Sequence, residues 1–250
     1  MSTMVPILTY HSLDDTGSVI STPPAVFRAQ MNALWSRGFQ GIGLGELLDA
    51  WDRGHQRWTR PVVLTFDDAF QNLTDHAAPV LRQLRFRATV FAVANYCGRT
   101  NAWPTQTAGV PILPLLTMSE LRELTGQGIE IGSHGLTHAP LDRLTPQEAE
   151  REVVESRSVL EAELKAPVPL FAYPYGAADP VARALVRQHY RGACSVEMGT
   201  ARTDADRHWL QRIDMYYFRD LELFRLFGTP LGRAYVGARA LGRRIKRAFA

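Results

Sequence analysis

Two pairs of ionisable residues follow apolar runs that are typical of buried strands. Val62-Val63-Leu64-Thr65-Phe66 leads directly into Asp67 and Asp68, and a second run leads into His134, with His138 four residues later. Adjacent carboxylates at the end of a buried strand are costly unless a cation or several donors compensate them. Two imidazoles at this spacing can meet one ion, and zinc accepts them. Two His and one Asp would leave one position open for water, as a catalytic zinc site requires.

Each pair also has a simpler interpretation. Asp is a common helix N-cap, so either carboxylate could begin the following helix. Two histidines at this spacing also occur as unrelated core or surface residues. Only the combination of both pairs at strand ends favours a metal site.

A third segment, Phe171-Ala172-Tyr173-Pro174-Tyr175-Gly176, also follows an apolar run. Turns of this composition usually do no more than reverse the chain. Its position after another strand makes it a candidate wall of a substrate groove.

The elements that must position these residues alternate between β-branched apolar runs and amphipathic stretches, which is typical of βα units around a parallel sheet. Seven strands predict an α/β fold, a (β/α) barrel with about seven parallel strands, in which the ionisable groups meet at the strand ends. The expected strands are residues 5–9, 62–66, 88–93, 129–131, 169–172, 192–196 and 209–213. The expected helices are residues 24–37, 45–51, 73–84, 119–125, 146–164 and 180–189.

Two start signals and one long connection refine this pattern. Thr145-Pro146-Gln147-Glu148 combines a cap, a proline at the first helical position and a glutamate that can complete a capping box, and Asp179-Pro180 begins the next helix similarly. The connection over residues 96–116, rich in Gly, Pro and Thr, is too long for an ordinary loop and predicts a functional loop beside the site.

Composition bounds the chain to one main domain. Its 250 residues are 46% apolar, enough for a large core. No run of eighteen apolar residues and no secretory signal is visible, so a cytoplasmic location or a truncated chain is expected. Cys97 and Cys194 lack the spacing of a thiolate metal site and are expected to be free thiols.

The net charge of +3 is unevenly distributed. Residues 231–250 carry six Lys and Arg and no acid, so the remaining chain has a net charge of −3. We therefore divide the chain into a catalytic domain at residues 1–220 and a basic helical tail at residues 221–250. The tail would suit peripheral contact with a membrane surface or an acidic polymer, although a solvated terminal helix is the simpler alternative.

The three segments, in this order and separation, resemble the signatures of the polysaccharide deacetylase family, also called the NodB-homology or carbohydrate esterase family 4 domain. Thr65-Phe66-Asp67-Asp68, Ser133-His134 through His138 and Tyr173-Pro174-Tyr175-Gly176 match its first three signatures. Tyr10-His11 matches a pair near the start of some bacterial members, including poly-N-acetylglucosamine deacetylases. The resemblance implies a distorted (β/α) barrel with fewer than eight βα units, which agrees with the expected count of about seven parallel strands.

The resemblance also implies roles. Asp67 would be the general base; Asp68, His134 and His138 would hold the metal. The backbone N–H of Tyr175 would stabilise the oxyanion, within a substrate wall that also includes Tyr173 and Pro174.

This chain departs from the family pattern at three positions. Ala69 replaces the usual glycine, and Ala172 stands where the family often has an arginine that orients the base. Leu210-Gln211-Arg212 lacks the late histidine that usually supplies the general acid. We hypothesise that His11 protonates the leaving amine and that Arg212 orients Asp67 or binds substrate.

Asp14 and Asp214 are lower-ranked candidates for these compensating roles. The remaining histidines are interpreted as structural, namely His55, His76, His189 and His208. The expected partner is an N-acetylated carbohydrate and not a nucleic acid. Zinc is the expected metal, with cobalt, nickel and manganese as alternatives. A hydrolase of a non-sugar amide or cyclic imide and an inactive sugar-binding protein remain the alternative functions.

Overall fold

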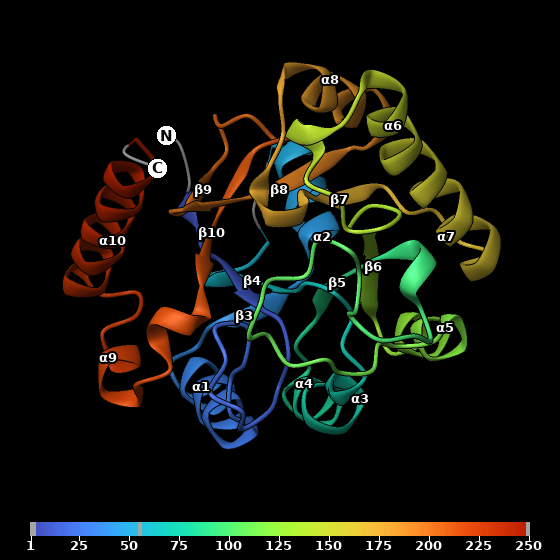
Figure 1. The fold of residues 1–250 in the computed structure, drawn as a ribbon. Helices are drawn as coiled ribbons and strands as arrows, with labels where there is room; N and C mark the ends of the chain where they lie inside the picture. The colour runs from blue at the N-terminus through green and yellow to red at the C-terminus, as the bar shows by residue number, and fades with distance from the viewer. Residues whose placement is uncertain (1–3, 55–56, 249–250) are drawn as a thin grey trace.

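A computed structural model describes residues 4–54 and 57–248. Seven parallel strands form a closed barrel surrounded by helices (Figure 1). The strands are β2 (Ile7–Tyr10), β4 (Pro61–Phe66), β5 (Ala88–Ala92), β6 (Ile129–Ser133), β7 (Leu170–Ala172), β8 (Gly192–Met198) and β10 (Leu210–Asp214). Pairing of β2 with both β10 and β4 closes the barrel. The predicted fold class and all seven predicted strands are thereby confirmed.

Three short strands were not predicted. β3 (Gln40–Ile42) pairs with the first half of β4, and β5 pairs with its second half. β1 (Met4–Val5) and β9 (Ala201–Arg202) form a separate antiparallel pair. Strands of two or three residues are too short to show an alternating apolar pattern, so the sequence carries no signal for them.

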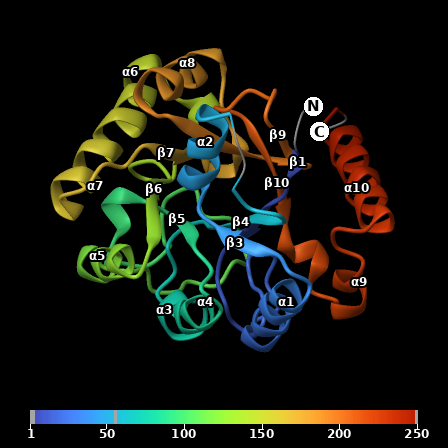
Figure 2. The ribbon, with the colours of Figure 1, turned by 180° about the vertical axis from the view of Figure 1, so that it is seen from behind.

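The helices lie outside the barrel except for α2 (Leu44–Asp52), which crosses its back end (Figure 2). Apolar side chains of α2 pack against inward-facing residues of the strands, such as Val63, Phe91 and Leu170. This plug closes the amino-terminal end of the barrel, and only the carboxyl-terminal end is left for chemistry.

Two predicted helices are interrupted. The helix predicted over residues 73–84 is two helices, α3 (Asn72–His76) and α4 (Ala78–Leu84). Pro79 has no N–H to continue the hydrogen-bond ladder, which explains the break before it. The helix predicted over residues 146–164 contains α6 (Pro146–Glu150), a π-helical turn at Arg151–Glu155, and α7 (Ser156–Leu164).

The other outer helices agree with prediction. They are α1 (Pro24–Ser36), α5 (Met118–Gly126) and α8 (Pro180–His189). Thr145 and Glu148 form the expected capping box at α6, and Asp179 accepts a hydrogen bond from the Ala182 N–H at the start of α8.

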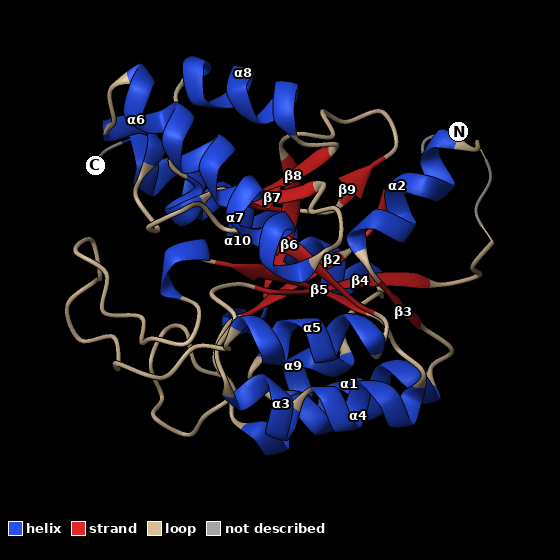
Figure 3. Ribbon diagram, turned by 90° about the vertical axis from the view of Figure 1, so that its right-hand side faces the viewer, coloured by secondary structure: helices blue, strands red, loops and turns tan. Residues whose placement is uncertain are grey.

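Residues 97–117 lie over the carboxyl-terminal end of the barrel, as the loops on the left of Figure 3 show. The buried side chain of Asn101 organises this loop, because it donates to the Pro111 carbonyl and accepts from the Leu113 N–H. The loop is therefore ordered from within and can present side chains to the site.

The expected tail is helical: α9 (Leu221–Arg225) is followed by α10 (Pro230–Ala248) along the side of the barrel (Figure 1). Among the described residues, no helix has the length and apolar character needed to cross a bilayer. Cys97 and Cys194 are free thiols, as expected.

Candidate active site

Asp67 and Asp68 occupy a tight turn at the end of β4. The Asp67 N–H donates to the Tyr10 carbonyl of β2, and Asp68 and Ala69 then adopt φ angles of 69° and 59°. A left-handed conformation costs a non-glycine residue about 1–2 kcal/mol. The methyl group of Ala69 is buried, which recovers about 0.8 kcal/mol and explains why alanine is tolerated at this position.

His134 follows β6 and is fixed by two hydrogen bonds. Its N–H donates to the Ala92 carbonyl, and its ring Nδ1 lies 2.8 Å from the Ala172 carbonyl oxygen. Because a carbonyl only accepts, Nδ1 carries the hydrogen and Nε2 presents a lone pair toward Asp68, 3.6 Å away. Burial, opposed by the charge of Asp67, lowers the pKa of His134 to about 4, so the ring is neutral near pH 7.

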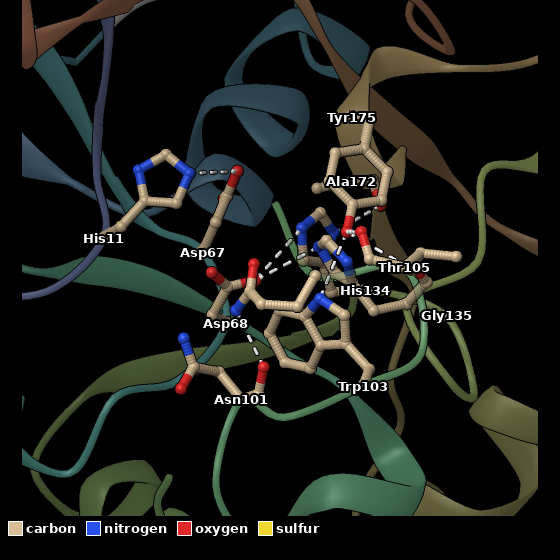
Figure 4. A network of polar contacts seen from close by, with 12 residues as sticks. His11, Asp67, Asp68, Asn101, Trp103, Thr105, His134, Gly135, Ala172 and Tyr175 are labelled. Carbon is tan, nitrogen blue, oxygen red and sulfur yellow. Dashed lines mark hydrogen bonds and ion pairs between the residues drawn. The ribbon is translucent and has the colours of Figure 1, made fainter. Parts of the chain in front are cut away.

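His138 completes the group after a turn in which it has a φ of 61°. Its Nε2 lies 3.3 Å from Asp68 Oδ1, and one ligand atom from each of Asp68, His134 and His138 lies within 4.8 Å of the others. All three side chains are buried (Figure 4 labels Asp68 and His134).

The arrangement fits a cation. Burial would raise the pKa of Asp68, but the imidazole of His138 and the charges around it hold this pKa below its usual value, so the carboxylate is ionised. An ionised oxygen facing the lone pair of a neutral imidazole is unfavourable unless a positive charge lies between them. Asp68 Oδ1 and His138 Nδ1 are also buried without a hydrogen-bond partner in the described part of the chain.

Asp67 pairs with Arg212 of β10. Both guanidinium Nη atoms lie 2.7 Å from carboxylate oxygens of Asp67, and Arg212 Nε donates to the Ser195 carbonyl. Both side chains are 3% exposed. Burial would raise the pKa of Asp67, but the guanidinium holds it well below its usual range. Of the two roles hypothesised for Arg212, orienting Asp67 is the one for which its side chain is placed.

His11 follows β2 on the other side of Asp67. Its Nε2 lies 3.9 Å from Asp67 Oδ2, and its side chain is 26% exposed (Figure 4). The side chain can therefore contact both the candidate base and a bound molecule.

The Tyr173-Pro174-Tyr175 segment divides into exposed and buried parts. Tyr175 has a φ of 57°, and its hydroxyl donates to the Thr105 carbonyl. The Tyr173 side chain packs between Phe171 and Trp209 and is fully buried. Pro174 is buried beside Gly135, outside the described residues that line the cavity.

A cavity of about 160 Å³ lies over these groups. Its polar lining includes His11, Asp67, Asp68, His134 and His138. Apolar and aromatic side chains form the rest of its wall, namely Val19, Ile20, Trp103, Val110, Tyr173, Tyr175 and Val196, together with Gln106 and Thr107. The loop over residues 96–116 therefore lines the cavity, as expected.

Sequence reasoning missed Trp103. Its indole ring stacks on His138 with centroids 4.1 Å apart, and its Nε1 donates to the Tyr175 hydroxyl (Figure 4). A tryptophan inside a Gly- and Pro-rich loop was the only available signal, because an aromatic residue in a loop needs a surface to pack on.

Glu152, on the π-helical turn, was also missed. Its buried carboxylate accepts from the Leu136 and Thr137 N–H groups and from the Thr137 hydroxyl, which fixes the turn between His134 and His138. Such π turns often occur at functional sites. Because Glu152 lies two turns after the start of its helix, the sequence gave no signal for its contact with the turn between His134 and His138.

The residues ranked lower have local structural roles. Asp14 accepts hydrogen bonds from Ser12, Thr16 and Ser21 in the loop after β2, and Asp214 accepts from the Tyr216 N–H. None of the described histidines His76, His189 and His208 lines the cavity. His55 lies outside the described residues.

A parallel barrel whose open end holds two imidazoles and a carboxylate, beside a second carboxylate, defines the class of metal-dependent hydrolases.

The chain belongs to the polysaccharide deacetylase family, whose model matches residues 55–191. It is 26% identical over 210 residues to the polysaccharide deacetylase-like protein YxkH of Bacillus subtilis, covering 84% of this chain and 70% of that protein. It is 26% identical over 199 residues to the poly-β-1,6-N-acetyl-D-glucosamine N-deacetylase of Staphylococcus epidermidis, covering 75% of this chain and 65% of that protein.

A solved structure shares the fold. The deacetylase PplD of Streptococcus pyogenes, in complex with acetate, superposes with a TM-score of 0.75 at 21% identity, covering 86% of this chain and 93% of that one.

Proposed function

We propose that this chain hydrolyses the acetamide of an N-acetylated amino sugar, using a divalent ion held by Asp68, His134 and His138. The observation that carries the proposal is the cluster itself: three buried side chains bring their ligand atoms together beside a second ionised carboxylate, that of Asp67. The relative named as a poly-β-1,6-N-acetyl-D-glucosamine N-deacetylase supports the choice of substrate class.

The ion supplies two effects when bound, since it acidifies a water molecule and polarises the acyl carbonyl. Asp67 accepts the proton of the attacking water. The pairing with Arg212 keeps the Asp67 carboxylate ionised but makes it a weak base. Asp67 could therefore accept a proton only from water that the ion would acidify. Arg212 holds the carboxylate in one orientation throughout.

His11 and Tyr175 take the remaining roles. His11 protonates the amine as it leaves, from a position in contact with both Asp67 and the cavity. The Tyr175 N–H donates to the oxyanion, with Tyr173 and Pro174 supporting the turn behind it. The inactive sugar-binding alternative rests on the missing arginine and histidine. Arg212 beside Asp67 and His11 at the cavity support the proposal that these two residues take the missing roles.

The cavity also limits how much substrate it can enclose. Its volume of about 160 Å³ lies below the roughly 300–1,000 Å³ of sites that enclose a whole small ligand. We infer that the acetamido group enters the cavity while the rest of the sugar stays at its mouth. The Val and Ile side chains of the wall suit the acetyl methyl group.

Zinc is the ion we propose, because a site of two imidazoles and a carboxylate suits it. Asp68→Asn removes the anionic ligand and is expected to weaken metal binding by at least about 10-fold to 100-fold, the range for losing a residue that only supports a ligand. Competition with a fluorescent chelator measures the affinity without any substrate. Asp49→Asn, at an exposed carboxylate of α2, is the matched control. Equal metal affinity in wild type and Asp68→Asn would show that Asp68 is not a metal ligand.

His11→Ala is expected to lower kcat for acetate release by about 100-fold, the usual scale for a lost general acid, with metal content unchanged. The deficit should shrink for substrates with a better leaving group, because these need less protonation. His76→Ala on α3 is a control for loss of an imidazole outside the cavity. If His11→Ala keeps the wild-type rate on an unactivated acetamide, the general acid must be another group.

The cytoplasmic location expected from the sequence remains a prediction.

A further inference from the structure

The outward face of α10 carries an apolar stripe. Leu231, Ala234, Ala238, Leu241 and Ile245 recur at alternating spacings of three and four residues, so they share one side of the helix. All five are exposed, and the three large side chains are 67%, 60% and 51% exposed, in chain order. We call these five residues the outer stripe.

The barrel does not explain this stripe, because it uses the opposite face of α10. Val236 is buried, the Tyr235 ring contacts Phe218, and the Tyr235 hydroxyl donates to the Tyr217 carbonyl. Gly232 lies so close to the Leu226 carbonyl that a Cβ atom would clash with it. With its inner face packed in this way, α10 lies at the edge of the molecule (Figure 1), and the outer stripe is exposed to solvent.

The charges around the stripe are all of one sign. Residues 223–250 contain no Asp or Glu. Arg243 approaches Asp214, and Arg239 lies against Tyr217 and Tyr235. Arg233 and Arg244 are eleven residues apart, on one flank of the stripe, and are exposed without an ion pair in the described part of the chain.

An apolar groove of about 720 Å³ runs along the same flank, between α10 and the barrel. Its walls include Phe39, Met198 and Phe227, and Leu241 of the outer stripe is at its rim. Arg60, Arg233 and Arg244 also line it. Arginine side chains next to apolar side chains match surroundings in which an anionic layer covers an apolar layer.

We propose that α10 docks on the surface of an anionic phospholipid bilayer. The outer stripe lies at the boundary between headgroups and acyl chains, and Arg233 and Arg244 contact lipid phosphates. The proposal goes beyond the hydrolytic activity and does not depend on it.

Charge argues for this occupant over a second copy of the chain. The spacing of the stripe could also serve a helix pair, as in a coiled coil. Two copies of α10 would, however, bring like charges together, since each contributes arginines and no acid, and like-charge contacts are unfavourable. An acidic polymer would match the arginines but leave Leu231, Leu241 and Ile245 in water.

Sedimentation of the intact 250-residue chain with sucrose-loaded vesicles tests the proposal. We expect binding to vesicles of phosphatidylglycerol and phosphatidylcholine, and binding at least about 10-fold weaker to phosphatidylcholine alone, as one kcal/mol per basic residue implies. Leu241→Ser/Ile245→Ser should lose at least about 10-fold, because two exposed apolar anchors are removed. Arg233→Glu/Arg244→Glu should lose about 30-fold or more.

Matched variants control for charge and hydropathy. Arg82→Glu/Arg122→Glu, on α4 and α5, makes the same charge change away from α10, and Val181→Ser removes an exposed apolar residue of α8. Both controls should bind as the wild type does. Thermal unfolding checks that every variant is folded.

Three outcomes would overturn the proposal. Equal binding to neutral and anionic vesicles would remove the role of the arginines. Unchanged vesicle binding of Leu241→Ser/Ile245→Ser would show that the outer stripe does not contribute to binding. A concentration-dependent dimer that this variant abolishes, in the absence of vesicle binding, would assign the face to a second copy instead.

Discussion

Replacing Asp67 with asparagine is expected to lower kcat/KM for acetate release by about 100-fold or more while the metal stays bound. Asparagine keeps the shape of the side chain but cannot take up the proton of water. The proposed metal ligands are separate residues, so chelator competition should report an affinity close to that of the wild type.

The structure adds a second consequence. Asp67→Asn leaves the buried charge of Arg212 without its partner, and breaking a buried pair costs about 3–5 kcal/mol. Activity must therefore be measured well below the melting temperature of the variant. Asp67→Asn/Arg212→Met removes both charges and should regain much of the stability while staying inactive. Wild-type turnover by a folded Asp67→Asn enzyme would show that Asp67 is not the base.

Arg212→Met is expected to lower the free energy of unfolding by about 3–5 kcal/mol near pH 7, because it leaves the buried Asp67 carboxylate unpaired. For a chain of this length, that loss corresponds to a fall in Tm of roughly 6–20 °C. Arg212→Lys keeps a positive charge but loses the paired hydrogen bonds, so its Tm should lie between those of the wild type and Arg212→Met.

The pH dependence of this loss has a definite sign. In the wild type the pKa of Asp67 is lowered on folding, so its stabilisation is present above the unfolded value of about 3.9 and is lost as the pH falls toward the folded value. In Arg212→Met, the largest influence that opposes burial is lost, so we expect burial to raise the folded pKa of Asp67 above the unfolded one. Protonation of Asp67 then removes the unpaired buried charge of the variant. The difference in Tm between wild type and Arg212→Met should therefore narrow as the pH falls from 7 toward 4. A difference that stays constant over this range would mean that lost packing, not charge, causes the destabilisation.

Much of the barrel could be predicted because its strands are encoded locally. The run from Val62 to Phe66 is apolar except at Thr65 and its residues are all buried, so composition alone identifies it as a strand. β3 could not be recognised, since Gln40-Gly41-Ile42 becomes a strand only by pairing with β4. The π-helical turn at Arg151–Glu155 likewise carries no local signal.

The candidate site was predictable to the extent that its chemistry resides in residue types. Asp67, Asp68, His134 and His138 are ionisable residues at strand ends, and such residues converge in any parallel barrel. Arg212 could be named as a candidate, but its choice of partner could not be derived from the sequence.

The order of the strands, the ionisable residues at their ends and the basic tail, with no acid after Glu222, were all determined by the sequence itself, because each depends on neighbours along the chain. Tertiary structure alone decided that Arg212 meets Asp67 across 145 residues, that Trp103 covers His138, and that Glu152 holds the turn before it. It also decided which face of α10 remains in solvent. These features depend on pairs of surfaces that only closure of the barrel brings together.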